Sequence, residues 1–528
     1  MSAQPEVSVT PQMSGQLSAG DPSRGSRPVR TAAIVNLGCK VNQAEMESAA
    51  RHLRERGVGL VNGNGGATPA DLVVVNTCTV TAEADAKSRH AVRRARRANP
   101  DAEIVVTGCS VQVARSAFEE ADPGARLVDN RHKDGLIAEL ERLTGVGRVA
   151  AGSDGGGSTV GVGRGGATVG GALPTLSGVE IEGIDDGRAS VERTRAFIKV
   201  QDGCSFFCTY CIIPAARGPE RSLSPATVLT DVRRALRAGH REIVLTGINI
   251  GTYDGGWSER GFRGAHTRSA LTLAGLVRRI LDETEIERIR ISSIEPQHVD
   301  DELLRVWAEG APRTLPHVHL PLQSGDDGVL HRMGRRYLSA DYAGVVERVR
   351  RSIPEVAVHG DVIVGFPTED DAAWLRSIDF IRSIDFAGIH VFRYSARPGT
   401  AAVRMAGAVE EPTKKARAAE LLGLAATARA RRAEADVGGV ADVLFESRLA
   451  DGRWVGHAAD YVPVVASAPA GQSLANAIGR VAVDGVDPSA RDRAVGRILW
   501  ISPPPVSALT LPHVPGVPRV PTGVADGR

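Results

Sequence analysis

The sequence Cys204-Ser205-Phe206-Phe207-Cys208-Thr209-Tyr210-Cys211 places three thiols at a Cys-x3-Cys-x2-Cys spacing within one short loop. Thiolates bind soft metals, and zinc or iron–sulfur sites with four protein ligands usually take the fourth from nearby. The nearest downstream candidate, His240, lies beyond a predicted helix. The spacing therefore favours a four-iron cluster with one iron left open for chemistry. A structural zinc site with a distant fourth ligand is the alternative.

This loop resembles the signature of the radical S-adenosylmethionine (SAM) superfamily, in which an aromatic residue, here Tyr210, precedes the third cysteine. The resemblance implies that the open iron chelates the amino and carboxylate groups of SAM. It also implies that one electron splits this cofactor into methionine and a 5′-deoxyadenosyl radical, with Tyr210 among the residues that bind the cofactor.

Upstream, three further cysteines each follow a predicted buried strand. The strands cover residues 31–38, 71–77 and 103–108, with predicted helices at 43–56 and 82–98 between them, and the cysteines are Cys39, Cys78 and Cys109. Strands that alternate with helices form a parallel sheet, and ligands collect beyond the carboxyl ends of its strands. We therefore expect a second three-thiol site, although each cysteine alone could be a small buried core residue.

The residues around these cysteines, 37–43, 75–80 and 106–110, resemble three motifs of the methylthiotransferase amino-terminal domain. The resemblance implies two [4Fe-4S] clusters and two SAM molecules per turnover. One SAM methylates a sulfur at the Cys39 site, and the other gives the radical that removes hydrogen from the target carbon. It also implies an electron donor such as flavodoxin or ferredoxin, while the sulfur donor stays unknown.

Downstream of residue 193, six apolar strand candidates separated by helix-length segments predict an α/β fold with a partial (β/α)6 barrel. They cover residues 196–200, 242–245, 288–294, 317–322, 356–364 and 388–394. Sites in such barrels lie at the carboxyl ends of the strands, where the resemblance implies SAM contacts from Thr246, Gly247, Ser293, Glu295 and Gln323. Capping or turn roles are the alternative for these residues. His317, His319 and His359 are predicted to be structural.

The composition separates the chain into domains. We expect a disordered leader (1–30), the α/β amino-terminal domain (31–143), a Gly-rich linker (144–192), the radical SAM domain (193–437, closing with a helix over 410–437), a small β-barrel (438–500) and a disordered tail (501–528). Strand candidates at 440–445, 454–458, 462–466 and 494–500 indicate the β-barrel. By position it resembles a degenerate RNA-binding TRAM domain, although lysine is absent from it.

The net charge of +2 requires any RNA-binding surface to come from local clusters of basic residues. Candidates are Arg89, Arg93 and Arg97 on a predicted helix, for which a solvated helix face is the alternative, and Arg217 and Arg221 just after the thiol loop. Six cysteines in 528 residues are too few for a disulfide scaffold, and no apolar stretch has the ~20 residues of a membrane span. We therefore expect a cytoplasmic enzyme with reduced thiols.

The motifs at 38–43, 76–89 and 196–203 look most like the methylthiotransferase branch that modifies carbon 2 of N6-threonylcarbamoyladenosine beside the tRNA anticodon. The tRNA anticodon stem-loop is then the partner. The alternative substrates are N6-isopentenyladenosine in tRNA and an aspartate of a ribosomal protein. Two other classes remain, a two-cluster redox protein without a substrate and an RNA-associated zinc protein. Pro219 departs from the basic segment expected after the thiol loop.

Overall fold

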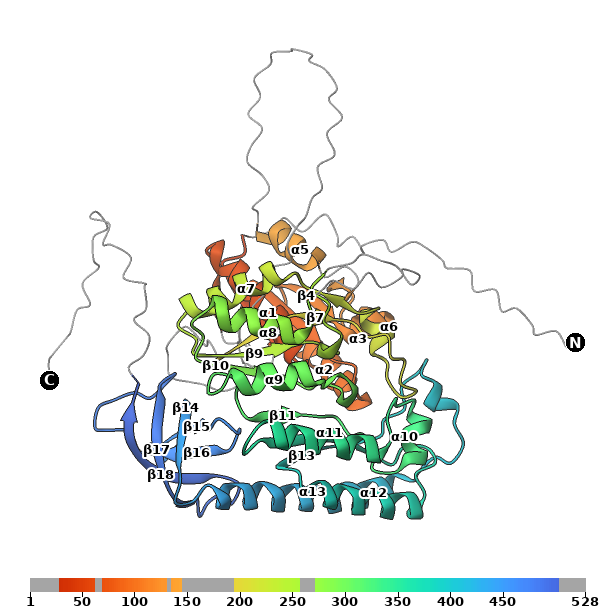
Figure 1. Cartoon of the computed structure of the whole chain (residues 1–528). Helices are drawn as coiled ribbons and strands as arrows, with labels where there is room; N and C mark the ends of the chain where they lie inside the picture. The colour runs from red at the N-terminus through yellow and green to blue at the C-terminus, as the bar shows by residue number, and fades with distance from the viewer. Residues whose placement is uncertain (1–27, 62–68, 131–133, 145–193, 257–270, 503–528) are drawn as a thin grey trace, which may run out of the picture.

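A computed structural model describes residues 28–61, 69–130, 134–144, 194–256 and 271–502, arranged as three packed domains (Figure 1). The predicted leader, linker and tail lie almost wholly outside these residues. Among the described helices, none combines the length and the apolar character needed to cross a bilayer.

The amino-terminal domain is a five-stranded parallel sheet in the order β2-β1-β3-β4-β5. The three predicted strands and two predicted helices are confirmed, and the short edge strands β2 and β5 were missed. The strands are β1 (Thr31–Asn36), β2 (Gly59–Val61), β3 (Leu72–Thr77), β4 (Glu103–Gly108) and β5 (Arg126–Val128). The helices are α1 (Lys40–Glu55), α2 (Ala82–Ala98), α3 (Cys109–Val113), α4 (Arg115–Ala121) and α5 (Asp134–Thr144).

Alternate residues of the central strands enter cores on opposite faces of this sheet. Val74 packs with Leu53 of α1 and Leu140 of α5. Val75, the next residue, packs with Val92 of α2 and Phe118 of α4. Helices on both faces explain why these strands are continuous apolar runs in the sequence.

The central domain contains the six predicted parallel strands in two groups of three, β10-β9-β6 and β11-β12-β13. The strands are β6 (Arg195–Lys199), β9 (Glu242–Thr246), β10 (Arg288–Ile291), β11 (His317–His319), β12 (Ala357–Val364) and β13 (Gly388–Arg393). The predicted partial (β/α)6 barrel is confirmed, and its six strands form two hydrogen-bonded groups. Within the described chain, the two groups are bridged between Ile289 and Thr314, although their residues share one hydrophobic core.

The helices of this domain cover the outer face of the strands, and α13 runs beneath β11–β13 to the carboxyl-terminal domain (Figure 1). They are α7 (Pro225–Arg237), α8 (Leu273–Glu283), α9 (Asp301–Glu309), α10 (Asp327–Met333), α11 (Ser339–Ser352), α12 (Asp371–Ile384) and α13 (Glu411–Ala435). The short α6 (Ile213–Arg217) instead packs against α3 of the amino-terminal domain. A short hairpin pairs β7 (Gln201–Asp202) with β8 (Arg221–Ser222) and closes the base of the thiol loop.

The carboxyl-terminal domain is a closed barrel in the order β14-β15-β16-β18-β17. Its strands are β14 (Val440–Arg448), β15 (Trp454–His457), β16 (Pro463–Ala466), β17 (Ile478–Val486) and β18 (Ala494–Ile501). Four strands were predicted, and β17 was missed because glycine, arginine and aspartate interrupt its apolar pattern.

Candidate active site

Cys204, Cys208 and Cys211 lie on the loop between β7 and α6. Gly203, at the start of the loop, has φ +72°, and an added Cβ would lie 2.0 Å from the Pro219 carbonyl oxygen, so only glycine fits. The Cys211 amide donates to the Cys208 carbonyl over 2.9 Å and closes the turn. The thiols are therefore held by backbone geometry.

Burial and neighbouring thiols raise the pKa of Cys204 to about 11 and that of Cys211 to about 12. A thiol in such surroundings ionises only when a cation compensates the charge, which a metal ligand receives from its metal. Three soft donors on one loop, without a disulfide, therefore fit a thiolate-bound iron cluster.

Two side chains that sequence reasoning missed reach the sulfur atoms of this loop. Arg335 Nη1 lies 3.6 Å from Cys208 Sγ and 3.5 Å from the Tyr210 hydroxyl, and its Nη2 pairs with Glu295. Asn249 Nδ2 lies 3.9 Å from Cys204 Sγ. Asn249 follows β9 and Arg335 follows α10, so the spacing within the thiol loop gave no signal for them. These N–H donors would stabilise negative charge on the sulfurs.

The predicted SAM contacts all lie at or just beyond the carboxyl ends of β9, β10 and β11. Thr246 is buried, and Ser293 is half-buried. Gly247 leaves room for Gln201, whose Oε1 would be 2.9 Å from an added Cβ. Gln323 has φ +71° and lines the pocket described below, whereas Glu295 is held by Arg335. Their roles in binding SAM stay predictions.

The second triplet lies at the carboxyl ends of β1, β3 and β4. Cys39 caps α1, Cys78 follows β3, and Cys109 begins α3. Burial raises the pKa of Cys78 to about 11, and the charges of Cys39 and Cys109 add to this rise, so the three sulfurs are electrostatic neighbours. Gly108 has φ +104°, and an added Cβ would lie 2.4 Å from the Thr77 carbonyl oxygen. This donor set also fits a thiolate-bound cluster.

Asn42 organises the Cys39 side of this site. Its Oδ1 accepts from Cys39 Sγ at 3.5 Å, and its Nδ2 donates to Asn76 Oδ1 at 3.0 Å and to the Thr77 carbonyl at 3.2 Å. The amide thus ties the ends of β1 and β3 together. Asn42 lies in the 37–43 motif, but the motif alone did not indicate this role.

Two buried arginines fasten the amino-terminal domain to the central domain beside the cysteines. Arg217, 1% exposed, pairs through Nη1 with Asp202 at 2.9 Å and Glu45 at 3.1 Å, and through Nη2 with Asn42. The prediction that Arg217 contacts RNA is therefore wrong, because its guanidinium is enclosed between the domains.

Arg397 makes the second link. Its Nη2 donates to Thr79 Oγ1 at 2.8 Å and pairs with Asp85. Asp85 also accepts from Ser110 Oγ at 2.5 Å. This chain of contacts connects the end of β13 to the residues that follow Cys78 and Cys109.

A pocket of about 230 Å³ adjoins the thiol loop and the residues that follow Cys78. One wall comes from the amino-terminal domain and another from the thiol loop and the start of α6. The rest comes from β12, the end of β13 and the segment after β11. The lining residues are Val80, Thr81, Tyr210, Cys211, Ile212, Ile213, Gln323, Asp361, Ile363, Phe392, Arg393, Tyr394 and Ser395. Its aromatic and apolar walls suit a planar ring.

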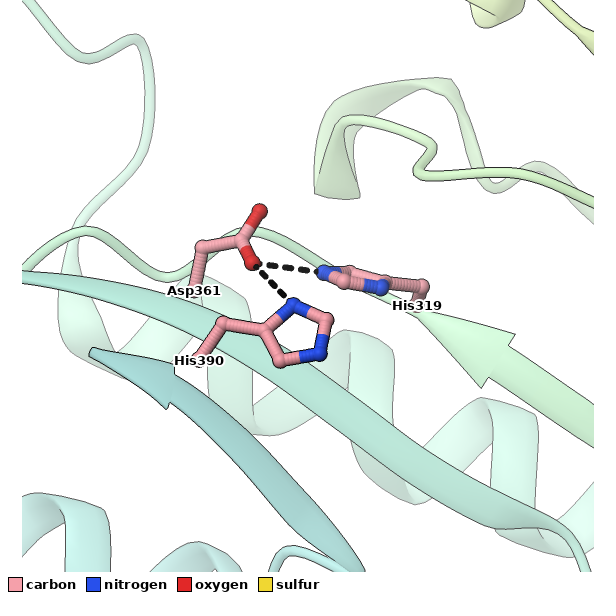
Figure 2. Close-up of side chains that lie close together, drawn as sticks. All are labelled: His319, Asp361 and His390. Atoms are coloured by element: carbon pink, nitrogen blue, oxygen red, sulfur yellow. Dashed lines mark hydrogen bonds and ion pairs between the residues drawn. The ribbon is translucent and has the colours of Figure 1, made fainter. Parts of the chain in front are cut away.

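Asp361 lies in this wall between two histidines. Its Oδ1 accepts from His319 Nε2 at 2.9 Å and from His390 Nδ1 at 3.2 Å, and Figure 2 shows both rings directed at this one oxygen. Burial opposes ionisation of Asp361, but the two hydrogen bonds outweigh burial and hold its pKa well below the usual range. The three donor groups lie within 4.8 Å of one another, which a divalent cation could span, and the same arrangement can pass a proton.

The other predicted RNA contacts differ in exposure. Arg93 and Arg97 are exposed on α2, and Arg89 is half-buried. Arg221 is half-buried, donates to the Arg217 carbonyl at 3.3 Å and lies 3.8 Å from Asp202. Of the five predicted RNA contacts, which all lie in the described chain, only Arg93 and Arg97 are therefore exposed.

Lys40 is the first residue of α1 and directly follows Cys39. Its side chain is exposed, and the titratable groups that act on it are those of Tyr461, Arg195, Asp361 and Arg290, which line the interior of the central barrel. Sequence reasoning did not indicate this position.

Two family models match separate parts of the chain. Residues 31–129 match the model of the uncharacterized protein family UPF0004, and residues 198–381 match the radical SAM superfamily. The chain is 34% identical over 447 residues to the threonylcarbamoyladenosine tRNA methylthiotransferase MtaB of Bacillus subtilis, covering 82% of this chain and 90% of that protein. It is also 34% identical over 391 residues to the Thermotoga maritima protein of that name, covering 74% and 80%.

A relative with a different substrate in its name matches nearly as well. The tRNA-2-methylthio-N6-dimethylallyladenosine synthase of Maricaulis maris is 33% identical over 390 residues, covering 71% of this chain and 78% of that protein.

Proposed function

Since the chain belongs to the radical SAM tRNA methylthiotransferase family, we propose that it attaches a methylthio group to carbon 2 of N6-threonylcarbamoyladenosine beside the tRNA anticodon. The observation that carries this proposal is the pocket whose walls include both Cys211 and the residues just after Cys78. A base held there faces both candidate cluster sites at once.

We assign one [4Fe-4S] cluster to each cysteine triplet. When bound, the cluster at Cys204 supplies the electron and open iron that family members use to cleave SAM, and the second cluster presents the sulfur. Hard radical steps of this kind are carried by cofactors, while the protein binds and orients.

The side chains of the pocket provide the binding and orientation. Phe392, 41% exposed, and Tyr394 offer faces on which a purine can stack. Asp361, which accepts hydrogen bonds from His319 and His390, can accept a further hydrogen bond from the substrate and so orient the base. Arg335 and Asn249 keep N–H donors directed at the thiol loop.

An anticodon loop suits this pocket because a loop base is unstacked at low cost and is recognised by shape and stacking. The exposed arginines of α2, Arg93 and Arg97, are our candidates for phosphate contacts. A tRNA substrate places the reaction in the cytoplasm, with a low-potential protein such as flavodoxin or ferredoxin as the electron donor.

The second candidate substrate is N6-dimethylallyladenosine in tRNA, favoured by the similarity to the Maricaulis maris synthase. Two synthetic anticodon stem-loops that differ only in the N6 substituent separate the candidates. After anaerobic reconstitution, the enzyme is expected to convert the threonylcarbamoyl stem-loop at least about tenfold faster, a preference worth about 1.4 kcal/mol. Preference for the dimethylallyl stem-loop would move the chain to the other branch. Cys204→Ala serves as the inactive control.

A further inference from the structure

The amino-terminal domain inserts the first turns of α1 into the open side of the central barrel. Ala44 of α1 packs against Phe197 of β6 and Val244 of β9. These two strand residues alternate with Ile198 and Ile243, which pack in the helix-covered core, so they face the barrel interior. Lys40 lies one turn before Ala44 and hence on the same face of α1.

The charged groups around Lys40 come from the interior of the barrel. They are Arg195 at the start of β6, Arg290 of β10 and Asp361 of β12, and beside them lies Tyr461 of the carboxyl-terminal domain, an uncharged residue whose ring lies beneath Arg290. Lys40 thus lies next to Cys39 in the chain and faces the barrel strand that carries Asp361.

Each of the other charged groups has a partner. Arg195 pairs with Glu446 at 3.2 Å and Arg290 with Glu242 at 2.7 Å. Asp361 accepts from its two histidines. Lys40 makes no hydrogen bond or ion pair with any residue in the described part of the chain, and its side chain is accessible to solvent. An ammonium group with three free donors in a concave site is suited to an incoming anion.

We propose that Lys40 binds the carboxylate of the threonyl group and thereby selects threonylcarbamoyladenosine over dimethylallyladenosine. The inference rests on the proposed function and names the residue that reads its substrate. A threonyl carboxylate is ionised at neutral pH, whereas a dimethylallyl group is apolar and uncharged. Asp361 lines the base pocket, and its charge also acts on Lys40, so the ammonium and the pocket both face the interior of the barrel.

The proposal predicts a coupling between one protein charge and one substrate charge. A hydrogen-bonded ion pair in such an enclosed site is worth about 10- to 100-fold in affinity. Removing either the Lys40 ammonium or the substrate carboxylate is expected to lower the affinity by this factor. Removing both should lower the affinity no further than removing one.

The test measures the affinity of reconstituted protein, without reductant, for three anticodon stem-loops carrying threonylcarbamoyladenosine, its methyl ester or dimethylallyladenosine. Wild-type protein is expected to prefer the acid to the ester by about 10- to 100-fold. Lys40→Met should bind acid and ester equally weakly, and Lys40→Arg should retain most of the preference. Lys415→Met removes the same charge from an exposed site on α13 and should behave like wild type. Iron content checks that the neighbouring Cys39 site is intact.

Retention of the full acid-over-ester preference by Lys40→Met would overturn the inference. An equal loss for all three stem-loops would also overturn it, because Lys40 would then contact a backbone phosphate. Failure of the proposed function looks different, since wild-type protein itself would then show no preference for the acid or would convert only the dimethylallyl stem-loop.

Discussion

At the scale of single residues, alanine substitutions in the two sets of cysteines are expected to remove different reaction products. Replacing Cys204, Cys208 or Cys211 by alanine should abolish formation of 5′-deoxyadenosine, because each is a ligand of the cluster assigned to SAM cleavage. Replacing Cys39, Cys78 or Cys109 should leave 5′-deoxyadenosine but remove the methylthiolated product. Chromatography of both products in one reaction measures the difference. A Cys39 variant that cannot cleave SAM, with the Cys204 site fully loaded with iron, would contradict the division of labour.

Glu242 should make stability depend on pH. It is fully buried between Arg288 and Arg290, both at 2.7 Å. Burial alone would raise the pKa of Glu242, but the two arginines outweigh burial and lower it from 4.5 to about 2. Its contribution is therefore complete above pH 4.5 and is lost as the pH falls towards 2.

The variant Glu242→Gln is expected to lose about 3–5 kcal/mol at neutral pH, because it leaves two buried arginines without a carboxylate. The difference in unfolding free energy from wild type should shrink progressively below pH 4.5. Urea unfolding at several pH values measures this difference. Glu55→Gln, at a side chain 63% exposed, is the control and should cost almost nothing. If the difference in unfolding free energy between Glu242→Gln and wild type stayed constant from pH 4.5 to pH 2, this would argue against the ion pairs of Glu242 with Arg288 and Arg290.

Sequence reasoning identified the cysteines and strand-end residues because their signal is local spacing. It missed Arg335, Asn249 and Lys40, whose roles come from contacts with segments far away in the chain. Arg217 was misread as an RNA contact for the same reason. A basic residue after the thiol loop gives no sign that Glu45 and Asp202 enclose it.

At the scale of elements, α6 and α1 couple the two cysteine sites, because Arg217 ends α6 and pairs with Asn42 and Glu45 of α1. We expect Arg217→Met to loosen this contact while leaving the thiol loop in place. The ratio of methylthiolated product to 5′-deoxyadenosine should then fall several-fold, since positioning errors of about 1 Å are costly to catalysis. Arg221→Met is the neighbouring control. If a folded, iron-loaded Arg217→Met protein kept the wild-type ratio of methylthiolated product to 5′-deoxyadenosine, Arg217 would not couple the two cysteine sites.

Long apolar elements were predictable, and short or interrupted ones were not. The central strands of the amino-terminal sheet and helix α13 follow directly from apolar runs and helical composition. The strands β2 and β5 have three residues each, too few for a periodic signal. The division of the central strands into two groups depends on which backbone groups meet across β10 and β11, which no local pattern encodes.

At the scale of the whole molecule, the metal content separates an enzyme with two clusters from its rivals. We expect about eight irons and eight sulfides per chain after anaerobic reconstitution, as two four-iron clusters require. The triple variant of Cys39, Cys78 and Cys109 should hold about half as much. Stoichiometric zinc in place of iron would instead support the structural-metal alternative.

The central claim is that this chain methylthiolates threonylcarbamoyladenosine in tRNA, and mass spectrometry of tRNA nucleosides tests it most directly. Cells that lack the protein should lose 2-methylthio-N6-threonylcarbamoyladenosine. Complementation with wild type should restore the nucleoside, and complementation with Cys204→Ala should not. An unchanged level of this nucleoside, together with loss of the methylthiolated dimethylallyl derivative, would contradict the account.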